Sequence, residues 1–320
     1  MKAKARAHAN IALIKYWGKE DEELSIPNNS SLSLTLEAFY TETEVEFSEL
    51  ISEDEFYLDN RKDDITLLKV SKFLDLFRDR LNIKTRAIVK SINYVPTAAG
   101  LASSASAFAA LAAAANKASG LNLNDKALST FARKGSGSAT RSIYGGIVEW
   151  QKGDSDQTSY AIEIDDANWD IGMVVVLVNS NEKKISSTKA MKQTVLTSPY
   201  YPSWVKDSEK DLIDIKAAIK DRDIRKIGEI SERNALKMHA TMLAAKPPIM
   251  YFEPNSILVI QIVQQLREKG IAAYFTMDAG PNVKILCKLS DANTIKEDLL
   301  KSFDKKDIIV TKVGPKVQII

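Results

Sequence analysis

The most constraining feature of this chain is a loop of small residues that leads into an alanine-rich run. The loop is Val95-Pro-Thr-Ala-Ala-Gly-Leu-Ala-Ser-Ser-Ala-Ser106, and the run continues to Asn116. A residue before proline is disfavoured in the α region, so the chain should enter this loop in an extended conformation. Alanine is the strongest helix former and serine is a favoured cap, so a helix should begin near Ser103 and Ser104.

A loop of this kind is suited to bind an anion. The free amides at a helix start point outward, and the helix macrodipole adds roughly half a positive charge there. Small side chains let a ligand approach the backbone, and serine hydroxyls can bind phosphate oxygens or a hydrated Mg²⁺. No Gly-Lys-Ser/Thr closes the loop, so it is not a Walker loop. A well-capped core helix that binds nothing is the alternative explanation of the same residues.

Composition limits the other functions that the chain could have. Its 320 residues, of which 45% are hydrophobic, predict a substantial core in two domains or in one large domain. The 44 basic and 42 acidic residues nearly cancel, so we expect no binding to nucleic acid or to a membrane. The single cysteine, Cys287, excludes an internal disulfide framework and favours a reducing compartment, so we expect a cytoplasmic protein.

Histidine is equally scarce. Only His8 and His239 occur, so zinc sites and Cys–His or Ser–His dyads are poorly supplied. Any chemistry must therefore rest on aspartate, lysine, arginine, serine and a bound metal ion.

Period-two alternation between turn residues predicts an antiparallel sheet with one face in water in the first half of the chain. Its predicted strands cover residues 32–36, 41–47 and 56–58, and residues 2–14 and 85–93 also alternate like strands. Helical spacing of apolar residues predicts helices over 67–81, 105–116 and 125–134. A second turn of small residues, 135–142, leads to a short helix and then to a strand that begins near residue 145.

The composition becomes polar between residues 180 and 202, and apolar periodicity returns after this junction. The predicted helices of the second half cover residues 212–219, 224–242, 257–269 and 291–301. Its predicted strands cover residues 173–179, 271–277, 283–288 and 308–313. This order fits a two-layer α+β sandwich.

Asp278 is the first candidate for a catalytic acid or base. It ends an apolar strand and is followed by Ala-Gly-Pro, where side-chain bulk is minimal and a ligand can come close. A carboxylate in this place can accept a proton from a substrate hydroxyl. The alternative is a turn aspartate that bonds its own backbone.

Lys15, Lys19 and Arg141 are the candidate cations. Arg141 lies in the small-residue turn 135–142, which is a second plausible anion-binding site. The planar guanidinium of arginine can donate two parallel hydrogen bonds to a carboxylate or a phosphate. The alternative for Lys19 is ion pairing with the acidic run 20–23, and Tyr16 and Trp17 are equally well explained as core aromatics. Lys183, Lys184 and Ser187 in the polar junction either close over a phosphate or form a solvated loop.

Several motifs resemble those of known enzymes. Residues 96–105 resemble the phosphate-binding loop of the GHMP kinase superfamily. The stretch Ala9-Asn-Ile-Ala-Leu-Ile-Lys-Tyr-Trp-Gly-Lys19 is similar to the opening signature of the diphosphomevalonate decarboxylases within that superfamily. Residues 27–33, 136–142 and 276–284 also resemble these enzymes, in the same order, so the resemblance spans nearly the whole chain.

The resemblance implies a GHMP-kinase-like two-domain α+β fold. Residues 1–184 would form an N-terminal α+β domain with a left-handed crossover, which binds nucleotide and phosphate. Residues 185–320 would form a C-terminal ferredoxin-like α/β sandwich, and the active site would lie in the cleft between the two domains. A homodimer is also expected by resemblance.

The implied reaction belongs to the mevalonate pathway of isoprenoid biosynthesis. It is the ATP-dependent decarboxylation of (R)-5-diphosphomevalonate to isopentenyl diphosphate, ADP, phosphate and CO₂, with ATP as co-substrate and Mg²⁺ as cofactor. The tertiary hydroxyl is a poor leaving group until it is phosphorylated. Once the phosphate leaves, loss of CO₂ supplies the electrons for the double bond.

The resemblance also implies a role for each candidate residue. Asp278 would orient and deprotonate the tertiary hydroxyl with Lys15 beside it, and Arg141, assisted by Asn10, would hold the substrate carboxylate. The substrate diphosphate would be bound by Tyr16, Lys19, Ser136, Gly137 and Ser138. The ATP phosphates would be bound by Ala99, Gly100, Leu101, Ala102, Ser103, Ser104, Ala105 and Ser106, with Mg²⁺ held near Ser104 through the nucleotide. Lys183 and Ser187 would complete the γ-phosphate site.

Two other functions compete with this one. A sibling GHMP kinase would phosphorylate mevalonate or phosphomevalonate, and Tyr16, Lys19 and the turn 136–138 argue against it because a second phosphate needs extra cations and donors. A non-catalytic nucleotide-binding or RNA-binding protein could use the same scaffold. The near-zero net charge and the lack of a basic, aromatic-studded strand weigh against that alternative.

Overall fold

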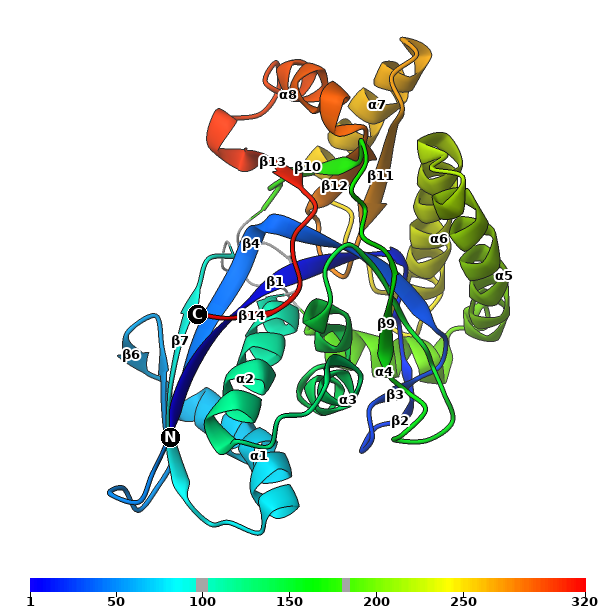
Figure 1. Ribbon diagram of the computed structural model, residues 1–320. Coiled ribbons are helices and arrows are strands. Elements are labelled where there is room, and N and C mark those ends of the chain that lie inside the picture. The colour runs from blue at the N-terminus through cyan, green and yellow to red at the C-terminus, as the bar shows by residue number, and fades with distance from the viewer. Residues whose placement is uncertain (96–102, 180–184) are drawn as a thin grey trace.

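The structure is a computed structural model that describes residues 1–95, 103–179 and 185–320. Two large β-sheets with helices around them dominate the described residues, which confirms the predicted α+β class (Figure 1). Most of the predicted anion-binding loop, residues 96–102, lies outside the described residues, as do Lys183 and Lys184. Within the described residues, no helix is both long enough and apolar enough to cross a lipid bilayer.

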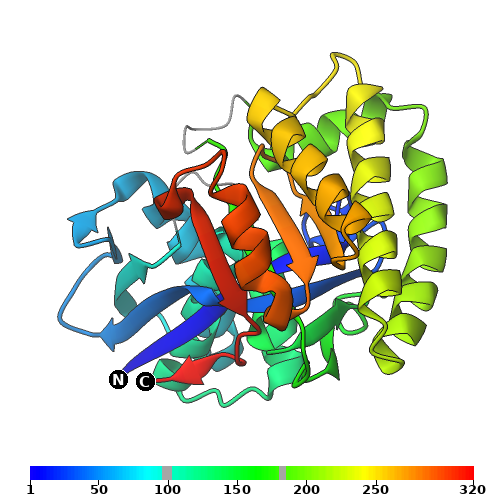
Figure 2. The ribbon, with the colours of Figure 1, turned by 90° about the horizontal axis from the view of Figure 1, so that it is seen from above.

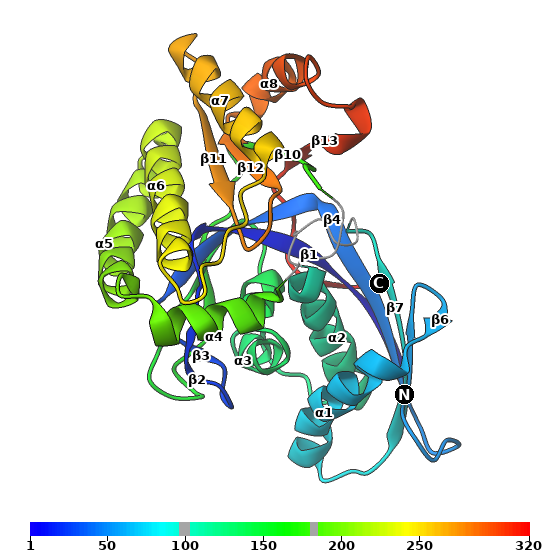
Figure 3. The same cartoon turned by 180° about the vertical axis from the view of Figure 1, so that it is seen from behind.

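The first sheet has eight strands in the described residues, and its main path runs β14-β1-β4-β7-β5-β6 with β8 and β9 attached through β4. Its strands are β1 (Lys2–Ile14), β4 (Ser31–Ser48), β5 (Glu55–Leu58), β6 (Arg61–Lys62), β7 (Arg86–Asn93), β8 (Ile147–Trp150), β9 (Ala161–Asp165) and β14 (Gln318–Ile319). A separate pair is formed by β2 (Lys19–Asp21) and β3 (Ile26–Pro27). One face of the large sheet carries α1 (Asp64–Leu81), α2 (Ser103–Ser119) and α3 (Asp125–Gly135), as Figures 1 and 3 show.

This sheet differs from its prediction in two ways. The predicted strands 32–36 and 41–47 are one long strand, β4, whose pairing with β1 shifts register between His8 and Asn10. The prediction of antiparallel pairing is wrong for residues 56–58, because β5 pairs with β7 in parallel. The helix α1 lies between them in the chain and supplies the crossover that parallel neighbours require.

Small side chains set the position of α2. Its alanines are buried against Ala5 and Ala7 of β1, so the helix backbone can lie close to the sheet. Substituting larger side chains on either surface would push the two apart, since core packing tolerates little added volume. This packing fixes the position of the helix start, at Ser103 and Ser104.

The second sheet has the order β11-β12-β10-β13, and all its pairs are antiparallel. Its strands are β10 (Gly172–Val176), β11 (Ala273–Met277), β12 (Val283–Cys287) and β13 (Ile308–Lys312). The helices α7 (Pro254–Glu268) and α8 (Ala292–Leu299) cover its outer face (Figure 2). The sequence of strands and helices is βαββαβ, the ferredoxin-like arrangement that the resemblance implies.

Three further helices lie between β10 and α7: α4 (Ser187–Thr197), α5 (Tyr201–Lys220) and α6 (Ile224–Leu243). The helix α4 was not predicted, because the polar junction shows no clear apolar stripe. Ser186 caps it by accepting from the Lys189 N–H, and Pro199 follows its end. These two residues are the start and stop signals that could have identified the helix.

The two sheets share a core. One hydrophobic cluster joins Ile11 and Leu13 of β1 with Met173 of β10, Leu286 of β12 and Ile227 of α6. The strand β10 belongs by sequence to the predicted N-terminal domain, residues 1–184, but it pairs with β12 and β13 of the second sheet. We therefore propose that the division between the domains falls in the segment between β9 and β10.

Candidate active site

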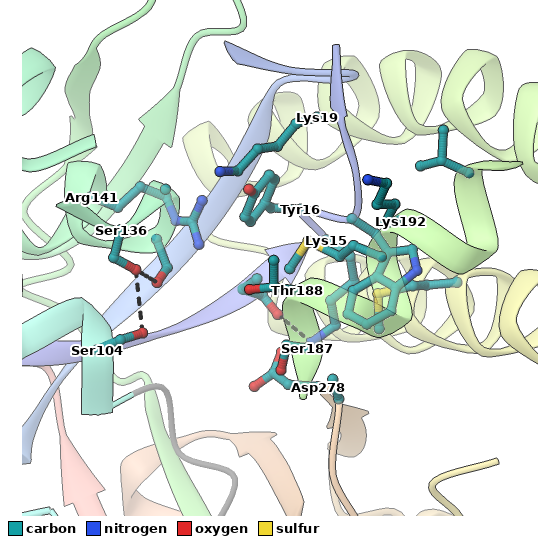
Figure 4. A pocket seen from close by; sticks show the side chains of 18 of the residues that line it. Lys15, Tyr16, Lys19, Ser104, Ser136, Arg141, Ser187, Thr188, Lys192 and Asp278 are labelled. Carbon is teal, nitrogen blue, oxygen red and sulfur yellow. Dashed lines mark hydrogen bonds and ion pairs between the residues drawn. The ribbon is translucent and has the colours of Figure 1, made fainter. Parts of the chain in front are cut away.

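A cavity of about 600 Å³ lies where the two halves of the chain meet, and this volume is typical of small-molecule sites. The end of β1, the start of α2, the 3₁₀-helix Gly137–Ile143, α4 and the turn after β11 all contribute to it (Figure 4). The cavity brings together most of the predicted site residues: Asn10, Lys15, Tyr16, Lys19, Ser103, Ser104, Ser136, Gly137, Ser138, Arg141, Ser187 and Asp278.

Asp278 lies between two lysines at one end of the cavity. Its Oδ1 is 2.7 Å from Lys15 Nζ, and its Oδ2 is 3.4 Å from Lys284 Nζ. Both lysine side chains are buried, whereas 24% of the Asp278 side chain is exposed to the cavity. The two cations therefore approach from the protein side and leave part of the carboxylate accessible to a ligand.

Burial and charge shift the pKa values of this cluster. Burial lowers the pKa of the Lys15 ammonium to about 8, although Asp278 opposes the shift. Burial by itself would raise the pKa of the Asp278 carboxyl, but Lys15 and Lys284 lower it far below its usual range. Asp278 is therefore ionised at neutral pH, and Lys15 titrates close to the physiological range.

Arg141 is held in the opposite wall by neutral groups. Its Nε donates to the Ser33 hydroxyl at 3.0 Å, and its Nη1 donates to the Ser31 hydroxyl at 2.6 Å. Nη2 has no hydrogen-bond partner within the described parts of the chain. Arg141 is 2% exposed, and burial lowers the pKa of its guanidinium to about 10, so it stays protonated.

Asn10 orients this arginine. Its Oδ1 accepts from Arg141 Nε at 3.3 Å, while its Nδ2 donates to the Ser138 carbonyl at 3.0 Å and to the Ser142 hydroxyl at 2.8 Å. Both ends of the amide are occupied by the protein. Asn10 therefore supports Arg141, and it has little capacity left for a direct contact with substrate.

Tyr16, Lys19 and the turn 136–138 form a third wall. The Tyr16 ring lies 4.8 Å from the Trp150 ring, and a side chain at Gly137 would come within 2.9 Å of the Tyr16 hydroxyl. Lys19 Nζ is 3.1 Å from the Ser25 hydroxyl and 3.5 Å from an exposed Glu22 carboxylate. Such a weak, exposed ion pair leaves the Lys19 charge available for an anion.

The serines at the start of α2 divide into two groups. Ser103 and Ser104 line the cavity, and the Ser136 hydroxyl lies 3.2 Å from that of Ser104. Ala105 and Ser106 are buried, and the Ser106 hydroxyl bonds to Thr41 at 2.7 Å instead of facing the cavity. Of the other predicted ATP-binding residues, Ala99, Gly100, Leu101, Ala102 and Lys183 lie outside the described residues.

Known proteins with this architecture are closely similar to this chain. Residues 7–161 match the family model described as the diphosphomevalonate decarboxylase-like N-terminal domain, and residues 173–318 match the mevalonate 5-diphosphate decarboxylase C-terminal domain. A diphosphomevalonate decarboxylase from Candida albicans is 35% identical over 319 residues, which cover 94% of this chain and 88% of that protein.

The chain belongs to the diphosphomevalonate decarboxylase family.

Solved structures of the family have the same fold. The crystal structure of mevalonate diphosphate decarboxylase from Staphylococcus aureus superposes with a TM-score of 0.96 at 49% identity, covering 100% of this chain and 98% of that chain. A complex of MDDEF with MVAPP, AMPPCP and magnesium superposes with a TM-score of 0.95 at 50% identity, covering 100% and 99%. In this family fold, the cavity lies where both halves of the chain contribute side chains.

Several charged or titratable side chains that line the cavity or lie behind its wall were not predicted. Lys284 is fully buried behind Asp278, and its place in the alternating strand 283–288 gave no reason to expect a charge inside. Lys69 of α1 and Lys192 of α4 line the cavity, but helical spacing alone places such lysines in solvent. Burial lowers the pKa of His239 to about 4, with Lys15 opposing its protonation, so its imidazole is neutral.

The helix α4 brings Ser187, Thr188 and Lys192 to one side of the cavity (Figure 4). The Lys192 ammonium has no ion pair or hydrogen bond to any other residue that the structure describes. Met191 from the same helix, with Trp17 and Met238, makes this side partly apolar. The wall therefore offers an unpaired cation beside a surface that can accommodate hydrocarbon.

The cavity fits Mg²⁺ that arrives with a nucleotide. Among the described residues, no cluster of three or more His, Cys, Asp or Glu side chains could form a metal cage. Asp278 is already paired with two lysines, whereas the Ser103 and Ser104 hydroxyls at the start of α2 line the cavity and are suited to a hydrated ion. Mg²⁺ typically keeps several waters and binds substrate phosphates, which suits so few protein ligands.

Proposed function

We propose that the protein catalyses the ATP-dependent decarboxylation of (R)-5-diphosphomevalonate to isopentenyl diphosphate, with ADP, phosphate and CO₂ as the other products. The observation that carries the proposal is that an ionised carboxylate, Asp278, and a buried guanidinium, Arg141, line one cavity. The substrate has one group for each of them, a tertiary hydroxyl and a carboxylate. The solved relative with MVAPP, AMPPCP and magnesium supports the same substrate and co-substrate.

The first step is phosphoryl transfer to the tertiary hydroxyl. The hydroxyl oxygen attacks the γ-phosphorus of ATP, its proton passes to the Asp278 carboxylate, and ADP leaves. Because its pKa is low, Asp278 is always ionised but is a weak base, so it takes the proton only as the new oxygen–phosphorus bond forms. General-base assistance of this kind contributes roughly 10²–10⁴-fold in rate.

The second step breaks two bonds. The bond between the tertiary carbon and the phosphate oxygen breaks, its electron pair leaves with phosphate, and positive charge develops on the carbon. The carbon–carbon bond to the carboxylate then breaks, and its electron pair forms the double bond as CO₂ departs. By then Asp278 has passed its proton to water in the cavity, again because its pKa is low, and its negative charge stabilises the developing cation.

Arg141 holds the substrate carboxylate in this proposal. Its free Nη2 and its fixed orientation suit a carboxylate that must stay in place until the carbon–carbon bond breaks. The contact takes place in a buried pocket, where charge–charge attraction is stronger than in water. Asn10 acts through Arg141 by keeping the guanidinium plane fixed.

The remaining residues bind the phosphates. Tyr16, Lys19, Ser136, Gly137 and Ser138 bind the substrate diphosphate from one wall. Ser103, Ser104 and the amides at the start of α2 bind the nucleotide phosphates, together with Ser187 and Lys183. Magnesium, when bound with the nucleotide, neutralises phosphate charge, and positioning with charge neutralisation accounts for most of phosphoryl-transfer catalysis.

A substrate panel tests the proposal. ADP release is measured by a coupled assay with diphosphomevalonate, phosphomevalonate and mevalonate, and CO₂ is measured in parallel. We expect ADP and CO₂ in equal amounts with diphosphomevalonate, and neither product with the other two substrates. ADP without CO₂ from either of the other two substrates would instead identify a sibling kinase. Absence of turnover with all three would favour a binding protein.

We also propose a homodimer in the cytoplasm. The one cysteine, Cys287, is buried and unpaired, which suits a reducing compartment. Light scattering of the purified protein, with and without nucleotide, measures the oligomeric state. A mass of about one chain at all concentrations would contradict the dimer.

A further inference from the structure

The backbone of Lys15 is held by two buried asparagine side chains. Its N–H donates to Oδ1 of Asn234 at 2.8 Å, and its C=O accepts from Nδ2 of Asn29 at 2.9 Å. Asn234 is 0% exposed and Asn29 is 1% exposed. The backbone from which the Lys15 ammonium reaches Asp278 is therefore fixed at both of its polar groups.

The Asn234 amide can satisfy its neighbours in only one orientation. Its Nδ2 donates to Oδ2 of Asp211 at 2.9 Å and to the Ser208 hydroxyl at 3.3 Å. An ionised carboxylate only accepts hydrogen bonds, so the NH₂ group must face Asp211. The amide oxygen must then face the Lys15 N–H, which is a donor.

Asp211 is itself held in place from α6. Its Oδ2 accepts from Lys237 at 2.9 Å, and its Oδ1 accepts from Arg233 at 3.0 Å. Burial by itself would raise the pKa of the Asp211 carboxyl, but its hydrogen bonds with Asn234, Lys237 and Arg233 lower it. The carboxylate is therefore ionised, and it keeps the acceptor character that orients Asn234.

We infer that Asn234 is a positioning residue for Lys15, and that Asp211 sets the orientation of its amide. The chain of contacts runs from the α5–α6 pair (Figure 3) through Asp211 and Asn234 to Lys15 at the end of β1. Neither residue lines the cavity, so neither is a catalytic residue. The inference rests on the proposed function, because it gives Lys15 its place beside the reacting carboxylate.

Two single substitutions each disrupt the hydrogen bond between the Asn234 amide and the Asp211 carboxylate. Asn234→Asp keeps an acceptor for the Lys15 N–H but places two carboxylates against each other. Asp211→Asn removes the negative charge that fixes the Asn234 amide. We expect kcat to fall by on the order of tenfold to 10²-fold in each, because small displacements of reacting groups are costly.

The double variant, Asn234→Asp with Asp211→Asn, restores one hydrogen-bond donor and one acceptor between the two positions. The new amide at position 211 can donate to the new carboxylate at position 234, which still accepts from Lys15. We expect kcat to recover most of the loss. Asp207→Asn is the matched control, because Asp207 of α5 also pairs with Lys237 of α6, whereas the α5 side chains that bond the Asn234 amide in the described residues are Ser208 and Asp211. Its kcat should equal that of the unaltered protein.

The pH profile separates positioning from a general loss of stability. Lys15 faces Asp278, Lys284 of β12, Arg141 of the 3₁₀-helix and His239 of α6, and none of these is altered. When Lys15 leaves its buried place, the pKa of its ammonium should rise toward its ordinary value, since burial is the main cause of its lowering. The alkaline limb of kcat should therefore move to higher pH in both single variants.

Hydrogen exchange of the Lys15 amide provides a readout that needs no substrate. The exchange rate should rise at least about tenfold in Asn234→Asp and in Asp211→Asn. In the double variant it should return to the rate of the unaltered protein. Unchanged exchange, or a lower kcat with an unchanged alkaline limb, would overturn the inference. If the unaltered protein turned over none of the three mevalonate derivatives, the proposed function would fail while the exchange data still decided whether Asn234 positions Lys15.

Discussion

The two ends of the cavity hold their charges in opposite ways. Within the described residues Arg141 bonds to neutral groups, the Ser31 and Ser33 hydroxyls and the Asn10 amide, so no ion pair in direct contact offsets its positive charge. Asp278 is bonded to two buried lysines, so its charge is more than balanced. The first arrangement is suited to binding an external anion, and the second to setting the reactivity of one carboxylate.

This comparison explains why neither the Arg141 arrangement nor the Asp278 arrangement is sufficient for catalysis alone. A buried, uncompensated cation is costly unless an anion reaches it, so Arg141 favours a ligand with a carboxylate. A carboxylate with a low pKa gains catalytic value only when a substrate hydroxyl is held against it. The Arg141 wall supplies that positioning, and the Asp278 cluster supplies the chemistry.

Removing the carboxylate should have the largest effect. Asp278→Ala should lower kcat by on the order of 10³-fold, because it removes the base and the charge that stabilises the developing cation. ATP binding, measured by calorimetry, should persist, because the proposal assigns the nucleotide phosphates to the start of α2 and gives Asp278 no contact with ATP before the transfer. A kcat near that of the unaltered protein would remove Asp278 from the mechanism.

The uncompensated cation should come next. Arg141→Lys keeps the charge but loses the bonds to Ser31 and Ser33 and the fork that suits a carboxylate. We expect kcat/KM for diphosphomevalonate to fall by on the order of 10²-fold, as lost bonds to charged groups cost about 1.5–3 kcal/mol each. An unchanged kcat/KM would mean that Arg141 serves only protein contacts.

Lys192 tests whether other unpaired cations behave as Arg141 does. Lys192→Ala should raise the KM for diphosphomevalonate by about tenfold, because the loss of one charged hydrogen bond is of this size, and kcat should change little. Lys189→Ala is the matched control, since Lys189 lies on the same helix but does not line the cavity. Equal KM values in the two variants would show that Lys192 does not contact the substrate.

The pH dependence should show the smallest effect. Lys15 has a lowered pKa of about 8, so its ammonium is present below that pH and is lost above it. If the ammonium is required beside Asp278, kcat at pH 8.5 should be about fourfold below its plateau, as for a single group that must be protonated. A flat profile from pH 7 to 9 would mean that either form of Lys15 supports turnover.

The local patterns in the sequence predicted most of the elements and the chemistry-bearing positions. The alternation in β1, the alanine run of α2 and the tight turn after β11 each identify their own segment, because helix and strand periods are local properties. Asp278, Arg141 and Lys19 were found because unusual residues stand in small-residue or aromatic surroundings. The helix α4 was not predicted because its apolar side is short, although the Ser186 cap marks its start.

Tertiary structure alone decided which charges meet. Lys284 reads as one residue of an alternating strand, yet the order β11-β12-β10-β13 buries it behind Asp278. Asn234 reads as a polar residue on an amphipathic helix, yet it bonds a backbone amide 219 positions earlier in the chain. Patterns of hydrophobicity determine which face of each element is buried, whereas partners between distant elements depend on how those faces pack together. The amino-acid sequence therefore indicated the reactive groups, and the packing of the two sheets around one cavity determined their protonation states and their positions.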